Sequence, residues 1–240
     1  HRSARLFPSP DELLLSRAAM PSGVRLRFRT DTRRLILRFE PLPGAKRLFD
    51  LCIGKRLICS LLANPADREV IFDNLPGKPT LLDVWLTQAH PIQLTGLFMD
   101  SGAHLDVVSD TRPKWITYGS SITHCRNTDR PTRTWPAVVA REANLNLTSL
   151  GFGGQCHLDP MVAMTIRDMP ADFISMKVGI NIQGGSSLSP RTFRSALLGF
   201  IRIVREKHAR IPIAVISPIV CLARESTPNA VGLSLGIMRE

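Results

Sequence analysis

The sequence is that of an ordinary globular protein and excludes a disordered, fibrous or membrane-spanning chain. It has 240 residues, of which 44% are hydrophobic and 21% are charged, so it can bury one large core or two smaller ones. Its longest apolar runs, such as residues 211–216, fall well below the roughly 18 residues that a membrane span needs. Residues 1–20 contain no apolar stretch long enough for a secretory signal. We therefore expect no membrane span.

A net charge of +11 raises the question of a nucleic-acid or acidic membrane partner. The densest arginine stretch, residues 25–38, has the alternating period of a half-buried strand pair. Its apolar positions, expected on an inner face, are Val24, Leu26, Phe28, Leu35, Leu37 and Phe39. The arginines should then form mostly a solvent-exposed face: Arg25, Arg27, Arg29, Arg33, Arg34 and Arg38. The stretch lacks interleaved exposed aromatic residues, so we predict no nucleic-acid partner.

The five cysteines form no CxxC pair and are odd in number, which argues against a disulfide framework or a zinc site. We expect most of them to be small buried apolar residues, although a disulfide between Cys125 and Cys156 stays open. The cysteine count and the missing signal favour a cytoplasmic location. Because the chain begins at His1, we also expect that part of the natural N-terminus is missing. No metal or cofactor is predicted.

The first half of the chain, from residue 22 to about residue 108, reads as all β. Short alternating runs, which include residues 48–53, 70–72, 81–86 and 92–98, are separated by turn residues such as Pro43-Gly44 and Asp100-Ser101-Gly102. This spacing predicts an antiparallel β-sandwich. Before it, residues 11–18 favour one short helix.

The second half has a different period and follows a polar connection at residues 109–114. Short buried strands are predicted at residues 115–118, 145–150, 172–178 and 211–217, with helical patterns between them, which indicates a parallel α/β sheet. One helix is predicted to begin at Ser189-Pro190, with an apolar face made of Phe193, Leu197, Phe200, Ile201 and Val204. A second is predicted after Trp135-Pro136, with Val138, Val139 and Ala143. A third is predicted from near Asn229 to Glu240. We place the domains at residues 1–110 and 111–240.

Three unusual loops each follow a predicted strand, and ligands of open parallel sheets bind at the carboxyl ends of strands. The first, residues 118–123, has a glycine and two serines that could expose a nucleophile, or could simply cap a helix. The second, residues 150–155, has three glycines but neither phosphate-binding nor dinucleotide spacing. The third, residues 178–181, puts the amide of Asn181 where it could donate to a developing negative charge.

In this order, the three loops resemble the SGNH hydrolase superfamily, also known as GDSL esterases. The Gly-Asp-Ser-Leu block resembles Gly119-Ser120-Ser121-Ile122, which implies that Ser121 is the nucleophile and that Ser120 replaces the usual aspartate. The family's second sequence block contains a glycine whose backbone N–H is an oxyanion donor. This glycine best matches Gly154, and a shift of the match by one residue would give Gly153. The block-three Gly-x-Asn matches Gly179-Ile180-Asn181, which implies that Asn181 is the side-chain donor.

The longer strings at residues 115–123 and 151–160 are similar to a bacterial subgroup with an N-terminal jelly-roll-like β domain. The resemblance therefore implies a β-sandwich followed by a flavodoxin-like α/β domain. It implies a serine esterase, deacetylase or acyltransferase that acts on a small-molecule ester or an acylated carbohydrate without a cofactor. The sequence does not distinguish water from an alcohol as the acceptor of the acyl group, and it predicts no oligomeric state.

The family's fourth block, Asp-x-x-His, does not occur after Asn181, where the only histidine is His208. We therefore expect an α/β domain that is truncated at its C-terminus and a chain that is nearly inactive as an esterase. His124 and His157 are alternative bases. The rival hypothesis is a non-catalytic binding module, or pseudoenzyme, with a carbohydrate-binding β-sandwich.

Overall fold

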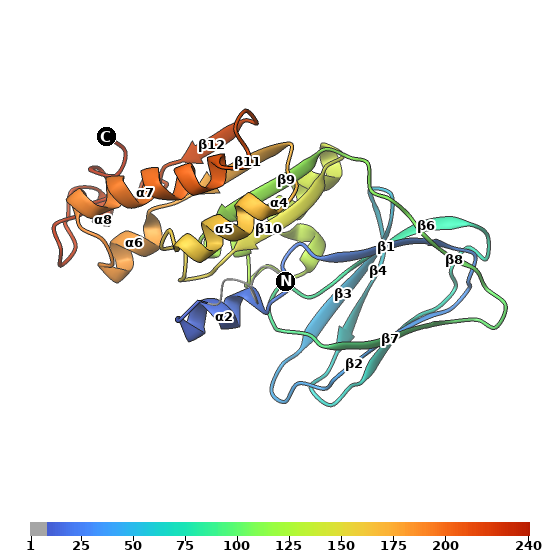
Figure 1. Cartoon of the computed structure of the whole chain (residues 1–240). Coiled ribbons are helices and arrows are strands. Elements are labelled where there is room, and N and C mark those ends of the chain that lie inside the picture. The colour runs from blue at the N-terminus through green and yellow to red at the C-terminus, as the bar shows by residue number, and fades with distance from the viewer. Residues whose placement is uncertain (1–8) are drawn as a thin grey trace. The chain divides into compact units, whose positions relative to one another are not determined.

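The computed structural model describes residues 9–240, which form two compact units that interleave along the chain (Figure 1). The α/β unit comprises residues up to 18, then 113–124 and 148–240. The β unit comprises residues 19–112 and 125–147. The first eight residues of the predicted N-terminal domain lie outside the described residues. The division into domains at residues 1–110 and 111–240 stays a prediction.

The β unit is built from two antiparallel sheets, as predicted. One has the strand order β4-β3-β6-β1-β8 and the other has the order β5-β2-β7. The strands are β1 (Arg25–Thr30), β2 (Leu35–Phe39), β3 (Arg47–Ile53), β4 (Arg56–Ala63), β5 (Glu69–Phe72), β6 (Thr80–Trp85), β7 (Leu94–Met99) and β8 (Leu105–Val107).

One hydrophobic core holds the two sheets together and draws side chains from both. Four of the six predicted inner-face residues are fully buried in it: Phe28, Leu35, Leu37 and Phe39. Leu26 is half-buried and packs against this core. The prediction for Val24 is wrong, because this residue precedes β1 and is 43% exposed.

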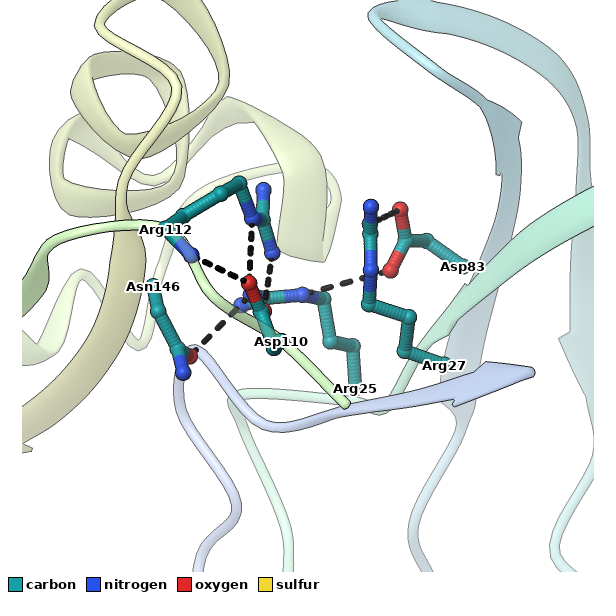
Figure 2. A network of polar contacts seen from close by, with 6 residues as sticks. All are labelled: Arg25, Arg27, Asp83, Asp110, Arg112 and Asn146. Carbon is teal, nitrogen blue, oxygen red and sulfur yellow. Dashed lines mark hydrogen bonds and ion pairs between the residues drawn. The ribbon is translucent and has the colours of Figure 1, made fainter. Parts of the chain in front are cut away.

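The prediction of a solvent-exposed arginine face is wrong for Arg25 and Arg27. Arg25 ion-pairs with Asp83 at 3.3 Å and with Asp110 at 3.1 Å, and only 6% of its side chain is exposed. Arg27 also pairs with Asp83. Figure 2 shows the six side chains of this network: Arg25, Arg27, Asp83, Asp110, Arg112 and Asn146. The other arginines of the stretch are exposed, as expected: Arg29, Arg33, Arg34 and Arg38.

Within the β unit, the 3₁₀-helix η1 (Pro131–Arg133) packs against β3 of the five-stranded sheet, and α4 (Trp135–Glu142) packs against η1. The buried carboxylate of Asp50, on β3, accepts hydrogen bonds from the backbone and the hydroxyl of Thr132. The helix after Trp135-Pro136 therefore exists, but its buried residues are Pro136, Ala137 and Ala140, whereas Val138, Val139 and Ala143 are exposed.

The α/β unit contains a parallel sheet with the strand order β10-β9-β11-β12, as predicted. Its strands are β9 (Lys114–Gly119), β10 (Asn146–Gly151, of which residues from 148 belong to this unit), β11 (Phe173–Lys177) and β12 (Ile213–Ile216). Its helices are α2 (Glu12–Ala18), α3 (Ser121–His124), α5 (Pro160–Asp168), α6 (Ile180–Gly185), α7 (Pro190–Arg205) and α8 (Leu222–Glu225). Helices α5 and α7 pack against each other (Figure 1).

Helix α7 begins as predicted, with Ser189 and Thr192 forming a reciprocal capping box and Pro190 in the first position. The predicted helix at residues 229–240 is wrong. Residues 229–240 form turns, which bury Leu233, Leu235 and Met238 in the α/β core. Backbone bonds from Leu235 and Gly236 to the carbonyls of residues 224 and 225 satisfy groups that a helix would have paired internally.

All five cysteines are free thiols, so the Cys125–Cys156 disulfide that the sequence left open does not form. Across residues 9–240, no helix is both long and apolar enough to cross a membrane.

Candidate active site

The three loops singled out in the sequence follow β10, β9 and β11, which are neighbours in the α/β sheet. Since neighbouring parallel strands end at the same edge, the loops lie at one edge of this sheet. A backbone bond of 2.8 Å from Phe152 N to the carbonyl of Gly119 joins the loop after β10 to the loop after β9. All the residues discussed below belong to the α/β unit.

The first loop buries Ser120 and exposes Ser121. The Ser120 carbonyl accepts the N–H groups of Thr123 and His124, which closes the single turn of α3. Ser120 is 1% exposed, and its hydroxyl accepts a hydrogen bond from Ile122 N at 3.3 Å. Ser121, the first residue of α3, is exposed. Of the two adjacent serines, only Ser121 is open to a substrate.

The second loop runs directly against the first. A Cβ placed on Gly153 would lie 3.7 Å from both Cα and Cβ of Ser121, so Gly153 lies close to Ser121. A Cβ on Gly151 would lie 2.3 Å from the backbone nitrogen of His124. The close approach of these backbones is the physical reason for the glycine-rich sequence.

Gly153 and Gly154, the two candidates for the family's backbone oxyanion donor, differ in the hydrogen bonds of their N–H groups. The Gly153 N–H donates to Nδ1 of His124 at 3.2 Å. The Gly154 N–H has no acceptor among residues 9–240. Gly154 also has a φ of +79°, a conformation that favours glycine. Of the pair, Gly154 has the N–H that remains available to a ligand.

The third loop holds Asn181 against the second. Gly179 has a φ of +116°, and Asn181 lies in the first turn of α6. The Asn181 Oδ1 accepts a hydrogen bond from Cys156 N at 3.1 Å. Because the oxygen of the amide is bound to this N–H, the NH₂ group of Asn181 points elsewhere and keeps both its hydrogens for other acceptors.

The three histidines that the structure describes in the α/β unit bind backbone groups. His124 is 0% exposed, and its Nδ1 accepts from Gly153, so that nitrogen carries no proton. His157 contacts the Gly154 carbonyl through Nε2 at 3.1 Å and the Ser187 hydroxyl through Nδ1 at 2.7 Å. Since a carbonyl only accepts, Nε2 of His157 must carry a proton. His208 is buried, and its Nε2 contacts the carbonyl of Ile166.

The nearby thiol does not compete with Ser121 as a nucleophile. Cys156 is fully buried, and this burial raises its pKa to about 12. The thiolate is the reactive form of cysteine, so Cys156 is unreactive near neutral pH. No group of three or more histidine, cysteine or acidic side chains among residues 9–240 could hold a metal ion.

One hydrogen bond to these loops was not predicted from the sequence. Arg17 Nε, on the N-terminal helix α2, donates to the Gly153 carbonyl at 3.0 Å. Arg17 follows the buried Leu14 by three residues, a spacing that puts both on one helix face, but nothing local to residues 9–20 indicates which segment this face meets.

Two family models match the chain. The GDSL-like lipase/acylhydrolase family matches residues 113–228, and the N-terminal domain of SsfX3 matches residues 1–95. A search of curated proteins gives no match.

Solved structures extend the likeness over the whole chain. The salicylyl-acyltransferase SsfX3 from a tetracycline biosynthetic pathway is 34% identical, with a TM-score of 0.87 over 100% of this chain and 70% of that one. A putative GDSL-like lipase from Bacteroides ovatus is 18% identical, with a TM-score of 0.76 over 93% and 69%. A family two carbohydrate esterase from Clostridium thermocellum is 13% identical, with a TM-score of 0.66 over 91% and 89%. At such identities the last two show the fold alone.

Proposed function

The chain belongs to the GDSL-like lipase/acylhydrolase family, and from this membership we propose that it transfers an acyl group from an ester through a covalent intermediate on Ser121. The observation that carries the proposal is the close approach of Gly153 to the exposed Ser121. Gly154, the next residue, carries an N–H group that has no acceptor among residues 9–240, and Asn181 is held by its amide oxygen, which accepts from Cys156 N.

The proposed chemistry has two steps. In the first, Oγ of Ser121 attacks the ester carbonyl carbon, its proton passes to a base, and the carbonyl oxygen becomes negative. When the tetrahedral intermediate collapses, the alcohol leaves with a proton and an acyl ester remains on Ser121. In the second, water or another alcohol attacks that ester and releases the serine.

The negative charge that develops on the carbonyl oxygen is the main charge that the site must stabilise. We assign its donors as the backbone N–H groups of Ser121 and Gly154 and the Nδ2 of Asn181. Fixed donors stabilise the charge as it develops, and removal of one such donor costs about 10² to 10³ in kcat in other serine hydrolases.

We assign none of the three histidines above as the base. Nδ1 of His124 is occupied by Gly153, His157 is held by Gly154 and Ser187, and His208 binds the carbonyl of Ile166. A serine hydroxyl is a weak nucleophile without a base. We therefore expect slow turnover by residues 1–240 and a gain when a soluble base such as imidazole is added.

We propose a substrate class from what the relatives' names say they act on. SsfX3 is a salicylyl-acyltransferase, and several lower-identity structures are carbohydrate esterases. We propose an ester of a small molecule or an acylated carbohydrate as the acyl donor. Because SsfX3 is the relative with 34% identity, an alcohol acceptor is the second candidate beside water.

The test is hydrolysis of 4-nitrophenyl acetate by the wild type, Ser121→Ala and Ser120→Ala, each with and without imidazole. The proposal predicts an imidazole-dependent rate that is lost in Ser121→Ala and kept in Ser120→Ala. Adding a primary alcohol then separates an acyltransferase, which forms the new ester, from a hydrolase, which forms acetate. Equal rates for wild type and Ser121→Ala would refute the proposal and favour the binding module, which titration with soluble oligosaccharides would test.

A further inference from the structure

We propose that Arg17 is a positioning residue that orients the Gly153–Gly154 peptide so that the Gly154 N–H faces the oxyanion. This inference rests on the proposed function. The observation behind it is the 3.0 Å hydrogen bond from Arg17 Nε to the Gly153 carbonyl, which joins residues 136 positions apart.

The N-terminal helix α2 is anchored well enough to hold a side chain in place. Asp11 Oδ1 accepts the N–H of Leu14 at 2.6 Å, which caps the first turn. Leu14 is 4% exposed and belongs to the α/β core. Arg17 lies one turn further along the same face. A buried leucine therefore fixes the helix, and the arginine reaches the glycine loop from it.

The geometry of a trans peptide transmits this contact to the next residue. The C=O and N–H of one planar peptide point in opposite directions, and none of the described peptide bonds is cis. The Gly153 carbonyl and the Gly154 N–H belong to the same peptide. When Arg17 holds the carbonyl, the Gly154 N–H must point away from Arg17, and it meets no acceptor among residues 9–240.

The peptides on either side are held by other side chains. His124 accepts the N–H of the Phe152–Gly153 peptide, and His157 contacts the carbonyl of the Gly154–Gln155 peptide. His157 is itself held by Ser187. Three consecutive peptides of the loop are thus each fixed by one side chain, and Arg17 holds the middle one.

A pair of glycines needs such a restraint because glycine adopts positive and negative φ about equally readily. If the middle peptide turned over, its carbonyl would replace its N–H at the site and would repel an oxyanion. The guanidinium also polarises the peptide, because a charged donor on the carbonyl makes the hydrogen bond stronger than a neutral one. Arg17 acts on the reaction through this peptide without touching the substrate.

A spectroscopic test isolates this one peptide. The sequence contains only two Gly-Gly pairs, Gly153-Gly154 and Gly184-Gly185. In protein labelled with [1-¹³C,¹⁵N]glycine, an HNCO spectrum therefore shows two peaks, which Gly184→Ala assigns by removing one. We expect Arg17→Ala to move the Gly153–Gly154 peak and to leave the other in place. The matched control Arg194→Ala, at an exposed arginine of α7, should move neither. An unmoved Gly153–Gly154 peak in Arg17→Ala would overturn the inference.

Kinetics with imidazole and 4-nitrophenyl acetate test the consequence for catalysis. We expect Arg17→Ala to lower kcat by about 10- to 100-fold, less than full loss of an oxyanion donor, with KM changed by less than about twofold. Millimolar methylguanidinium should restore part of the rate in Arg17→Ala but not in wild type. An unchanged kcat, or a raised KM with normal kcat, would overturn the inference. A wild-type rate in Ser121→Ala would refute the proposed function instead, and the peptide-orientation test would still stand.

Discussion

The side-chain oxygen of Asn181 accepts a hydrogen bond from the backbone N–H of Cys156 at 3.1 Å. This bond crosses from the loop after β11 to the glycine loop after β10, and it determines which end of the amide faces away. The assigned oxyanion donor, Nδ2, is therefore oriented by a group that takes no part in the chemistry.

Two substitutions at Asn181 test the role of its donor, Nδ2, separately from the role of its acceptor, Oδ1. Asn181→Asp keeps an oxygen for Cys156 N but has no NH₂ group, whereas Asn181→Ala loses both. We predict that kcat falls by about 10² to 10³ in both variants, as for other lost oxyanion donors. The free energy of unfolding should fall only in Asn181→Ala. Steady-state kinetics with imidazole and urea unfolding measure the two effects, and a normal kcat in Asn181→Asp would exclude Nδ2 as a donor.

Two glycines of the same loop should respond to alanine for different reasons. A Cβ on Gly151 would collide with the backbone of His124, while a Cβ on Gly154 meets nothing within 4 Å but requires a φ of +79°. We predict that Gly151→Ala lowers the free energy of unfolding by about 3 kcal/mol, the upper end of the usual cost of overpacking, because rigid backbone cannot move aside. Gly154→Ala should cost about 1 to 2 kcal/mol. Urea unfolding curves decide this, and the reverse order would contradict the structure.

The arginine network makes the free energy of unfolding of the β unit depend on pH. Burial raises the pKa of Asp110, but the hydrogen bonds and charge of Arg112 outweigh it and, with the charge of Arg25, bring the pKa to about 2. The folded-state pKa is thus below the ordinary value of 3.8, so the stabilisation is complete above about pH 5 and is lost as the pH falls toward 2.

From this shift we predict that acid removes about 2 kcal/mol more from the wild type than from Asp110→Asn between pH 5 and pH 2. Chemical unfolding across that range measures the difference. Asp106→Asn, the same change at an exposed residue of β8, is the control and should follow the wild type. Parallel profiles for wild type and Asp110→Asn would show that the network does not stabilise the carboxylate.

Two thiols should be inert in the folded protein. Cys52 and Cys156 are both 0% exposed, and burial raises the pKa of each to about 12. At pH 8 only about one in 10⁴ of such thiols is ionised. We predict that iodoacetamide leaves both unmodified in native protein and modifies both in urea, as peptide mass spectrometry would show. Rapid alkylation of either in native protein would mean that its surroundings open.

The sequence predicted what depends on local pattern. Alternation identified Phe28, Leu35 and Leu37 as core residues, because a strand with one buried face repeats every two residues. The order of strands placed three loops at one edge, because parallel strands end together. The start of α7 followed from Ser189 and Pro190, which act within one turn.

What the sequence missed depends on segments far apart in the chain. Arg25 has the spacing of a solvent-facing residue, and only the fold brings Asp83, Asp110 and Asn146 to it. Residues 229–240 have helical composition, but burial of Leu233 and Leu235 outweighs this weak local preference. The contact of Arg17 with the glycine loop likewise joins two segments that no local pattern connects.

The central claim is that Ser121 is the nucleophile, and its most direct test is the site of the covalent acyl group. The protein would be incubated with 4-nitrophenyl acetate and imidazole, quenched in acid and digested with trypsin. Cleavage after Lys114 and Arg126 gives one peptide that contains both Ser120 and Ser121. The account predicts an acetyl group on Ser121 in the fragment spectra, present in Ser120→Ala and absent from Ser121→Ala. Acetyl on Ser120, or the same acetylated peptide from Ser121→Ala, would contradict it.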